Sequence, residues 1–547
     1  MKSTDLTYYW WNKWTVIAFL IVILVSLPLF TLLFNFFEAP GNSWTHIREN
    51  LLFEYFVNTL VLLMGVAFCT FLFGVSTAWI VSSYNFPGRS YFEWLLILPL
   101  GFPGYIMAYT YKELLDYSGP IQSFFRNRLH LNIEGGLFDM MNLPGAIFIL
   151  SITLFPYVFI ISRSSFLQQS KNLHEASSIL ESNRLRAFYK VALPLAWPAI
   201  VGGIALASME VLNDYGVVKY LGISTFTTGI FRTWFSLGDD TTTLYLACML
   251  LPFVFGLLFI ENFPRETRWF VPSITHNKPA ERTNLSRRNQ YLLTSICALI
   301  FLISFFIPLM QIIYWVYLTF HKVVDWDFLI LVFRSYALAL CTGGAVVFLS
   351  VILLYAVRLT PFKWLKNITR LASFGYAVPG VVIAVGILFP LLKFDKWLGS
   401  LFSDDGLSLF FSGTLFGLTS AYIVRFMAVG YISINTGFHQ IGIQVNEASR
   451  LLGNSTGRTL LKIDLPLIKS SLFTGILLVI VEVLKELPLT LVLRPFNYQT
   501  LATKAFDMAS NEMIAESASA ALIIILTGII PIIFLNRLIR IREDGTG

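Results

Sequence analysis

The sequence predicts an all-α integral membrane protein with about twelve transmembrane helices arranged as two tandem six-helix halves. Three observations lead to this fold class. Of 547 residues, 56% are hydrophobic and 13% are charged, whereas a soluble chain carries about 25% charged residues. Apolar runs long enough to span a bilayer recur along the chain. One polar segment with its surroundings occurs twice, 272 residues apart.

Each apolar run is interpreted as a helix, because lipid cannot hydrogen-bond an open backbone. The first run, 14–34, has 21 residues and follows two lysines, so we expect a retained span and not a cleaved signal peptide. The expected spans are 14–34, 56–80, 92–110, 143–167, 196–214, 242–262, 291–318, 333–357, 370–394, 409–432, 468–486 and 517–536.

Lysine and arginine are concentrated in alternate connections between these runs. The connections that follow an even-numbered span, together with both ends of the chain, hold most of them, whereas 35–55 and 319–332 hold few or pair them with acidic residues. The positive-inside rule then places both termini in the cytoplasm. This topology accounts for the formal net charge of +7, so the charge gives no reason to expect a nucleic-acid partner.

The repeat consists of "HEASSILESNRLRAFYKVALP" at 174–194 and "NEASRLLGNSTGRTLLKIDLP" at 446–466. The match continues into the next span, where "EVLNDYG" from Glu210 aligns with "EVLKELP" from Glu482. The predicted organisation is a first half over 1–262, a cytoplasmic linker over 263–290 and a second half over 291–547. Parallel repeats of this kind face each other around a pseudo-two-fold axis along the membrane normal, with the pathway between them.

The repeated segment is predicted to form two short amphipathic pieces. In the second copy apolar residues recur at helical spacing on either side of Gly453, which permits a positive φ. Pro466 suits a break before the next span. Such a piece either docks in a groove of a soluble partner or lies on lipid headgroups, and its residues alone leave both open.

The pattern Glu-Ala, a glycine six positions later and a closing Leu-Pro resembles the EAA loop of type I ABC importer permeases. The resemblance implies that the loop contacts the ATPase subunit, and two copies in one chain resemble the fused permeases of ferric-iron importers. One departure is Glu181, which stands at the glycine position of the first copy. The matched residues are Glu175, Ala176, Leu193 and Pro194 in the first copy and Glu447, Ala448, Gly453, Leu465 and Pro466 in the second.

The same resemblance implies the partners. No G-x-x-x-x-G-K-[ST] phosphate loop occurs in the sequence, so we expect no ATP hydrolysis by this chain and no cofactor bound to it. ATP and Mg are expected on two copies of a separate ABC ATPase subunit, and a soluble iron-binding protein delivers the cargo. The chain would then work by alternating access in a bacterial inner membrane.

Intramembrane carboxylates are the candidate pathway residues. Glu210 and Asp214 in the fifth span match Glu482 and Glu486 in the eleventh, and spacing of four puts each pair on one helix face. A charge facing lipid is costly, so these faces should turn toward protein or a wet cavity. With Tyr215 they suit transient contact with ferric ion and repel an oxyanion such as sulfate.

The structural alternative is that Glu482 pairs with Lys485 and that Glu210 and Asp214 cap or bond neighbouring helices. Import of thiamine, a polyamine or a phosphonate by the same architecture also stays open, as does an ion-coupled secondary transporter that uses the carboxylates as proton sites. No nucleophile with a base partner stands out, which disfavours an enzyme.

Two further features carry structural expectations. Pro103-Gly104 and Pro379-Gly380 should break the third and ninth spans. Arg163 and Arg425 are expected near the inner ends of their spans, where a guanidinium can extend to the interface.

Overall fold

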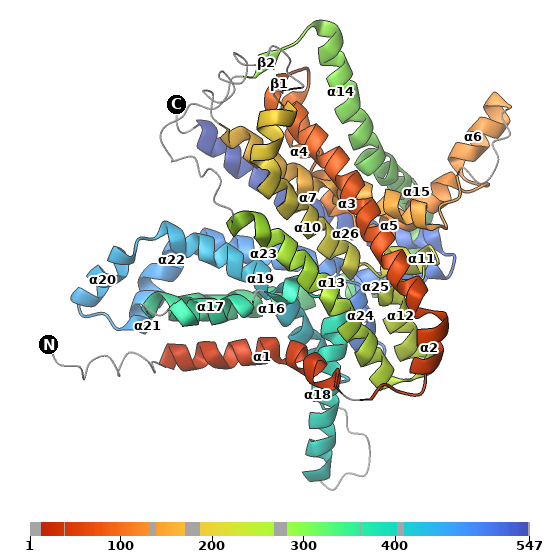
Figure 1. The fold of residues 1–547 in the computed structure, drawn as a ribbon. Coiled ribbons are helices and arrows are strands. Elements are labelled where there is room, and N and C mark those ends of the chain that lie inside the picture. Colours follow the sequence, from red (N-terminus) through yellow and green to blue (C-terminus); the bar gives the residue numbers. More distant parts are fainter. Residues whose placement is uncertain are drawn as a thin grey trace. The chain divides into compact units, whose positions relative to one another are not determined.

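The computed structural model describes residues 13–37, 39–130, 138–169, 186, 188–266, 282–360, 363–372, 374–401 and 410–544. Within these ranges the chain is built from helices and one two-stranded parallel ribbon (Figure 1). Nine helices in the described parts are long and apolar enough to cross a membrane, and the number rises to 12 if each of three bent helix pairs counts as one span. The predicted fold class is therefore confirmed.

The chain forms two compact units. The first unit comprises Met1–Trp44, Ile230–Met249 and Val324–Lys504, and the second comprises Thr45–Gly229, Leu250–Val323 and Ala505–Gly547. Four of the described helices contribute residues to both units: α2 (Trp44–Asn50), α12 (Phe226–Arg232), α13 (Asp240–Glu266) and α25 (Leu501–Ser510).

The first unit holds α1 (Lys13–Asn35), η4 (Thr233–Leu237), α16 (Trp326–Leu359), α17 (Lys363–Leu371), η6 (Phe374–Tyr376), α18 (Gly380–Leu401), α19 (Leu415–Gln440), α20 (Ile443–Leu451), α21 (Thr456–Thr459), η7 (Leu460–Asp464), α22 (Leu465–Leu467), α23 (Lys469–Lys485) and α24 (Pro488–Leu493). Its centre is a bundle in which α16, α19 and α23 pack on one another.

The second unit holds α3 (Leu52–Ser83), β1 (Tyr84–Asn85), α4 (Arg89–Leu95), η1 (Leu98–Gly101), α5 (Gly104–Leu115), α6 (Pro120–Leu129), α7 (Leu143–Gln168), η3 (Phe188–Ala192), α10 (Leu193–Asn213), α11 (Gly216–Tyr220), β2 (Thr283–Asn284), α14 (Arg287–Phe301), η5 (Leu302–Phe306), α15 (Ile307–Val323) and α26 (Ile514–Asp544). Here α3, α7 and α10 form the corresponding bundle.

One helix of each bundle begins and ends at equivalent positions of the repeat. Helices α7 and α19 start and stop at positions 272 apart, and so do the N-caps that begin them. The Asn142 side chain accepts from the Gly145 amide at 2.8 Å, and the Thr414 hydroxyl accepts from the Phe416 amide at 3.2 Å. Capping of this kind satisfies amides that the first helical turn leaves without partners.

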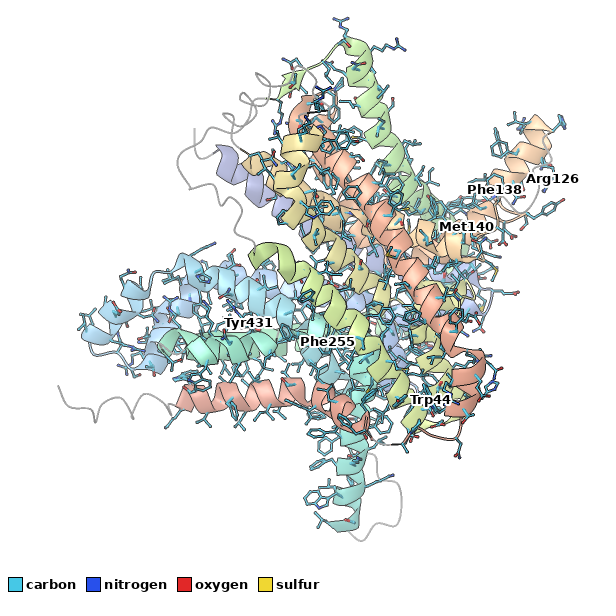
Figure 2. The ribbon with its side chains drawn as sticks, in the orientation of Figure 1. Trp44, Arg126, Phe138, Met140, Phe255 and Tyr431 are labelled. Carbon is cyan, nitrogen blue, oxygen red and sulfur yellow. The ribbon has the colours of Figure 1, made fainter. Side chains whose placement is uncertain are left out.

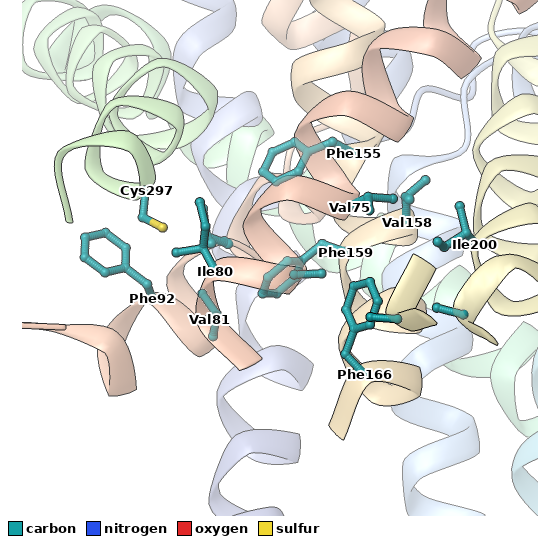
Figure 3. Packing of buried hydrophobic residues seen from close by; sticks show 14 of the residues in the cluster. Val75, Ile80, Val81, Phe92, Phe155, Val158, Phe159, Phe166, Ile200 and Cys297 are labelled. Carbon is teal, nitrogen blue, oxygen red and sulfur yellow. The ribbon is translucent and has the colours of Figure 1, made fainter. Parts of the chain in front are cut away.

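Apolar side chains fill the bundle of the second unit. Figure 3 shows Val75 and Val81 of α3, Phe155, Phe159 and Phe166 of α7 and Ile200 of α10 packed together. Since lipid is as apolar as these side chains, close van der Waals packing stabilises such a bundle more than removal of surface from water does.

Each bundle is covered by a helix from the other sequence half. Helix α1 packs on α16, α17 and α18 in the first unit, while α14 and α15 pack on α3, α4 and α5 in the second. The repeat did not predict this exchange, because sequence similarity does not specify packing partners. The predicted halves 1–262 and 291–547 are stretches of sequence, and their boundaries stay a prediction.

The two Pro-Gly breaks are confirmed. The chain bends by 95° between Arg89–Gly101 and Gly104–Leu129, and by 111° between Trp364–Tyr376 and Gly380–Leu401. Proline lacks the amide hydrogen that would continue the helix. A third bend of 75° separates Thr456–Leu467 from Lys469–Lys485, two residues after Pro466.

Helix α6, which contains Arg126, extends away from the bundle of the second unit, and Phe138 lies near it (Figure 2). The guanidinium of Arg126 lies 4.2 Å from the centre of the Tyr117 ring. Rings of Phe125 and Phe138 stack with centroids 6.4 Å apart.

Candidate functional site

The second repeated segment forms two short helices joined at Gly453. Helix α20 ends at Leu451, Gly453 has a φ of +84°, and α21 begins at Thr456. The Asn454 amide donates to the Ser449 carbonyl at 3.2 Å and the Gly453 amide to the Arg450 carbonyl at 2.9 Å. These bonds form a Schellman turn, in which a residue with a side chain would be strained at position 453. The sequence prediction for this turn is confirmed.

Buried polar contacts fix the two short helices to each other. The Asn446 amide donates to Oδ2 of Asp464 at 3.1 Å, and the hydroxyls of Ser449 and Thr459 lie 2.9 Å apart. All four side chains are buried. Because a buried polar group that loses its partner is costly, the segment should move as one piece.

Arg358 near the end of α16 holds this piece against the bundle of the first unit. Its guanidinium donates to the carbonyls of Phe438, Ile441 and Gly442 at 2.8, 2.9 and 3.0 Å, and to Oδ1 of Asn446 at 3.0 Å. One side chain therefore joins the end of α19 to the start of α20.

Two aromatic residues add a second attachment. The Tyr355 hydroxyl donates to the Thr456 carbonyl at 2.6 Å, and the Trp14 indole donates to the Thr456 hydroxyl at 3.4 Å. The two rings meet edge to face with centroids 5.0 Å apart. Helices α1 and α16 thus both contact the start of α21.

The opposite side of α20 is open. Glu447, Ala448 and Gly453 are exposed, and Leu451 and Leu452 are 89% and 84% exposed. A pair of leucines at the tip of a rigid short helix suits insertion into an apolar groove of another protein. Leu465 and Pro466 form the start of α22, before the bend at Ile468.

The first repeated segment is described only in its last part. Glu175, Ala176 and Glu181 lie outside the described residues, so their contact with an ATPase subunit stays a prediction. Leu193 and Pro194 open α10, directly after η3.

Among the candidate pathway residues, Glu486 has a full set of partners. Nε of Arg425 donates to its Oε2 at 3.0 Å, the Leu489 amide donates to its Oε1 at 3.3 Å, and both charged side chains are buried, at 3% and 5% exposed. Arg425 also donates to the Val378 carbonyl at 2.8 Å. The pair thus joins α19 to the break of the ninth span and to the start of α24.

The expectation that Arg425 extends to the interface is wrong. Helix α19 runs from Leu415 to Gln440, whereas the predicted span was 409–432. The helix continues past 432 because apolar residues such as Ile434 and Phe438 are buried there. This shift puts Arg425 near mid-helix, where a buried cation needs a carboxylate.

Asp214 occupies the position equivalent to Glu486 and makes the equivalent cap. It ends α10, and its Oδ1 accepts from the Val217 amide at 2.8 Å. A Cβ on Gly104 would lie 3.0 Å from its Oδ2, so this carboxylate lies against the break of the third span. Thr153, which is buried, stands at the position equivalent to Arg425.

The remaining candidates are partly or fully packed. Glu210 is half-buried, and Tyr215 is 8% exposed with its ring 6.1 Å from that of Phe506. Glu482 lies 3.9 Å from Lys485, the pairing given as the structural alternative. Among the described residues no three His, Cys, Asp or Glu side chains gather into a group that could hold a metal ion.

Comparison with known proteins places this arrangement in a family. The family model described as "Binding-protein-dependent transport system inner membrane component" matches residues 10–268 and 352–544. The chain belongs to this family. It is a multi-pass inner-membrane permease subunit of an ABC importer, which works with ATPase and binding-protein partners, and its two matched parts fit the fused two-half architecture.

The permease is similar to two iron permeases over most of its length. It is 24% identical over 531 residues to the Fe(3+)-transport system permease protein FbpB 2 of Haemophilus influenzae, covering 95% of this chain and 97% of that protein. It is 23% identical to the putative ferric transport system permease protein FbpB 1 of the same organism, covering 84% and 73%. The sulfate transport system permease protein CysW of Escherichia coli is 23% identical, covering 40% and 74%.

Proposed function

We propose that this permease imports ferric iron, delivered by a soluble binding protein and driven by two copies of a separate ATPase subunit. ATP and Mg bind on those subunits and no cofactor binds on this chain. Both termini and both repeated segments face the cytoplasm. The observation that carries the proposal of an ATPase-driven importer is the second repeated segment, a helix pair joined by buried polar contacts, with exposed leucines on one side and Arg358 on the other.

The geometry of the segment supports a lever. A partner that binds Leu451 and Leu452 displaces α20 when it moves. The polar contacts of α20, with those of Arg358, transmit this displacement to α16 and α19. Rigid elements that move as units are what alternating access requires. The first segment, with Glu175 and Ala176, is proposed to bind the second ATPase copy.

Full-length similarity to the two iron permeases supports iron as the cargo. Percentage identity does not separate them from the sulfate permease, since all three values lie within 23–24%. The iron permeases align with 95% and 84% of this chain and the sulfate permease with 40% of it, and this difference supports iron as the cargo. We propose that Glu210, Asp214, Tyr215, Glu482 and Glu486 line the pathway and contact iron transiently.

A sulfate-like oxyanion is the second candidate. A carboxylate repels an anionic substrate only where no cation compensates its charge. Arg425, at 3.0 Å, compensates the charge of Glu486. The similarity to sulfate permeases therefore keeps this candidate in place.

Uptake in cells that depend on this transport system distinguishes the two cargoes. Cells receive radiolabelled ferric iron or radiolabelled sulfate, and each label is challenged with an excess of the other unlabelled solute. We expect iron uptake that sulfate does not reduce and that Asp214→Asn lowers several-fold. Sulfate uptake that disappears with deletion of this chain, with no change in iron uptake, would reverse the assignment.

A further inference from the structure

A cluster of three arginines surrounds one carboxylate in the second unit. Glu93 of α4 forms ion pairs with Arg89 on the same helix, with Arg163 of α7 at 3.3 Å, and with Arg282 at 3.9 Å. We call these four residues the Glu93 cluster. None of the four belongs to the repeated segments or to the intramembrane carboxylates.

Three separate parts of the chain build the cluster. Strands β1 and β2 pair in parallel, with Tyr84 opposite Thr283 (Figure 1). Arg282 directly precedes β2, and its ion pair with Glu93 brings it to α4. The side chains of Asn85 and Asn284 extend this pairing with a hydrogen bond of 2.9 Å. The Thr294 hydroxyl donates to the Pro87 carbonyl at 3.1 Å. Residues far apart in the sequence are thus held around one acidic side chain.

Charge in the Glu93 cluster is unbalanced. Even without Arg282, two guanidiniums share the single negative charge of Glu93. Nε of Arg163 is shielded from solvent and makes no hydrogen bond with the described residues. The side chains of Arg89, Arg163 and Glu93 are 16%, 24% and 24% exposed, so solvent screens the excess positive charge only partly.

The cluster lies where apolar spans end. Arg163 is five residues before the end of α7, and α3 ends directly before β1. Phe92, the residue before Glu93, is 8% exposed and belongs to the apolar core. Tyr91, the residue before Phe92, is 63% exposed. Exposed tyrosines at span ends are typical of the headgroup level of a bilayer.

We propose that the Glu93 cluster binds the phosphate of an anionic phospholipid headgroup. Guanidinium groups match phosphate oxygens with paired hydrogen bonds, and basic sites between transmembrane helices on the cytoplasmic side bind acidic headgroups. Glu93 orients the arginines and competes with the phosphate for them. A bound lipid would fasten α4, α7 and the segment before β2 to one another at the membrane surface.

Native mass spectrometry of the full purified chain tests the proposal with phosphatidylglycerol, phosphatidylcholine and inorganic phosphate as probes. We expect phosphatidylglycerol to bind more tightly than phosphatidylcholine, with an affinity that Arg163→Gln lowers about fivefold. Glu93→Gln should raise that affinity, because it removes the competing carboxylate. Arg287→Gln, at the start of α14 and outside the cluster, serves as the matched control and should change nothing.

The sign of the Glu93→Gln effect separates binding from a purely structural role. A structural ion-pair network predicts lower thermal stability in Glu93→Gln and no gain in lipid affinity, and that result would overturn the proposal. Displacement of phosphatidylglycerol by millimolar inorganic phosphate would identify free phosphate as the ligand and also overturn it. Equal lipid affinity in all variants would also overturn the proposal. Thermal unfolding of each variant serves as the control that it is folded.

Discussion

Nε of Arg425 lies 3.0 Å from Oε2 of Glu486, with both side chains almost fully buried in the first unit. The pair joins the middle of α19 to the residues where α23 ends and α24 begins. Through the Val378 carbonyl, Arg425 also reaches the residue before the Pro379-Gly380 break. One ion pair therefore connects the middle of α19 with two points where helices end or are interrupted.

Removal of one member of this pair should destabilise the protein strongly. Arg425→Met leaves Glu486 buried without its cation, which costs roughly 3–5 kcal/mol. We expect a large fall in the apparent unfolding temperature of the purified chain, and a smaller additional loss when Glu486→Gln is combined with it. Glu482→Gln is the control, because the half-exposed pair with Lys485 contributes about 0–1 kcal/mol. Additive losses in the double variant would show that the pair does not act as a unit.

Arg358 should transmit movement of the second repeated segment without being needed for the fold. Arg358→Lys keeps the charge but cannot reproduce the forked set of donors. We expect ATPase subunits to remain bound while solute uptake per ATP hydrolysed falls several-fold, measured in proteoliposomes. Unchanged coupling in this variant and in Arg358→Gln would remove Arg358 from the lever.

Leu451 and Leu452 should matter for attachment and little for stability. Their exposure of 89% and 84% means that Leu→Ala removes almost no buried surface, so the unfolding temperature should stay within about 1 °C of the parent. Co-purification of the ATPase subunit should nevertheless fall by at least tenfold in the double variant. Leu24→Ala, at a 65% exposed position on α1, should leave attachment intact. Equal ATPase recovery with both variants would contradict the docking role.

The hydrogen bonds to the Asp239 carboxylate at the start of α13 should be sensitive to acid. Partial burial raises its pKa, but hydrogen bonds from the Thr242 and Ser43 amides and from the Thr242 and Thr241 hydroxyls outweigh that effect and lower the pKa from 3.8 to about 2. A depressed pKa contributes stability that is complete above the unfolded value near 3.8 and is lost as the pH falls through about 2.

The measurement is unfolding of the parent and of Asp239→Asn between pH 5 and 2. We expect the difference in stability between them to be largest near pH 5 and to shrink as the pH falls toward 2. A difference that does not change with pH would mean that ionised Asp239 contributes nothing specific.

Much of the fold follows from local sequence signals. In the described residues, apolar runs located the nine candidate spans and the three bent helix pairs. The Pro-Gly pairs located two breaks, and Gly453 located the turn in the second repeated segment. These features depend on a few neighbouring residues, so a single sequence contains them.

The features that were missed depend on contacts between distant residues. Three features were missed: the exchange of α1 and α14 between bundles, the Arg425–Glu486 pair and the Glu93 cluster. Each joins residues at least 60 positions from one another, with the exception of the neighbours Arg89 and Glu93. An arginine within an apolar run was a usable signal for a buried partner. The predicted span boundary misplaced Arg425 and so concealed that signal.

The most direct test of the central claim is uptake of radiolabelled ferric iron into proteoliposomes that contain this chain and its ATPase subunits, with iron-loaded binding protein on the outer side. We predict that uptake requires ATP on the ATPase side, survives an uncoupler, and disappears when Leu451 and Leu452 are both replaced by alanine. Iron entry that persists without the ATPase subunits and collapses with the uncoupler would contradict the account.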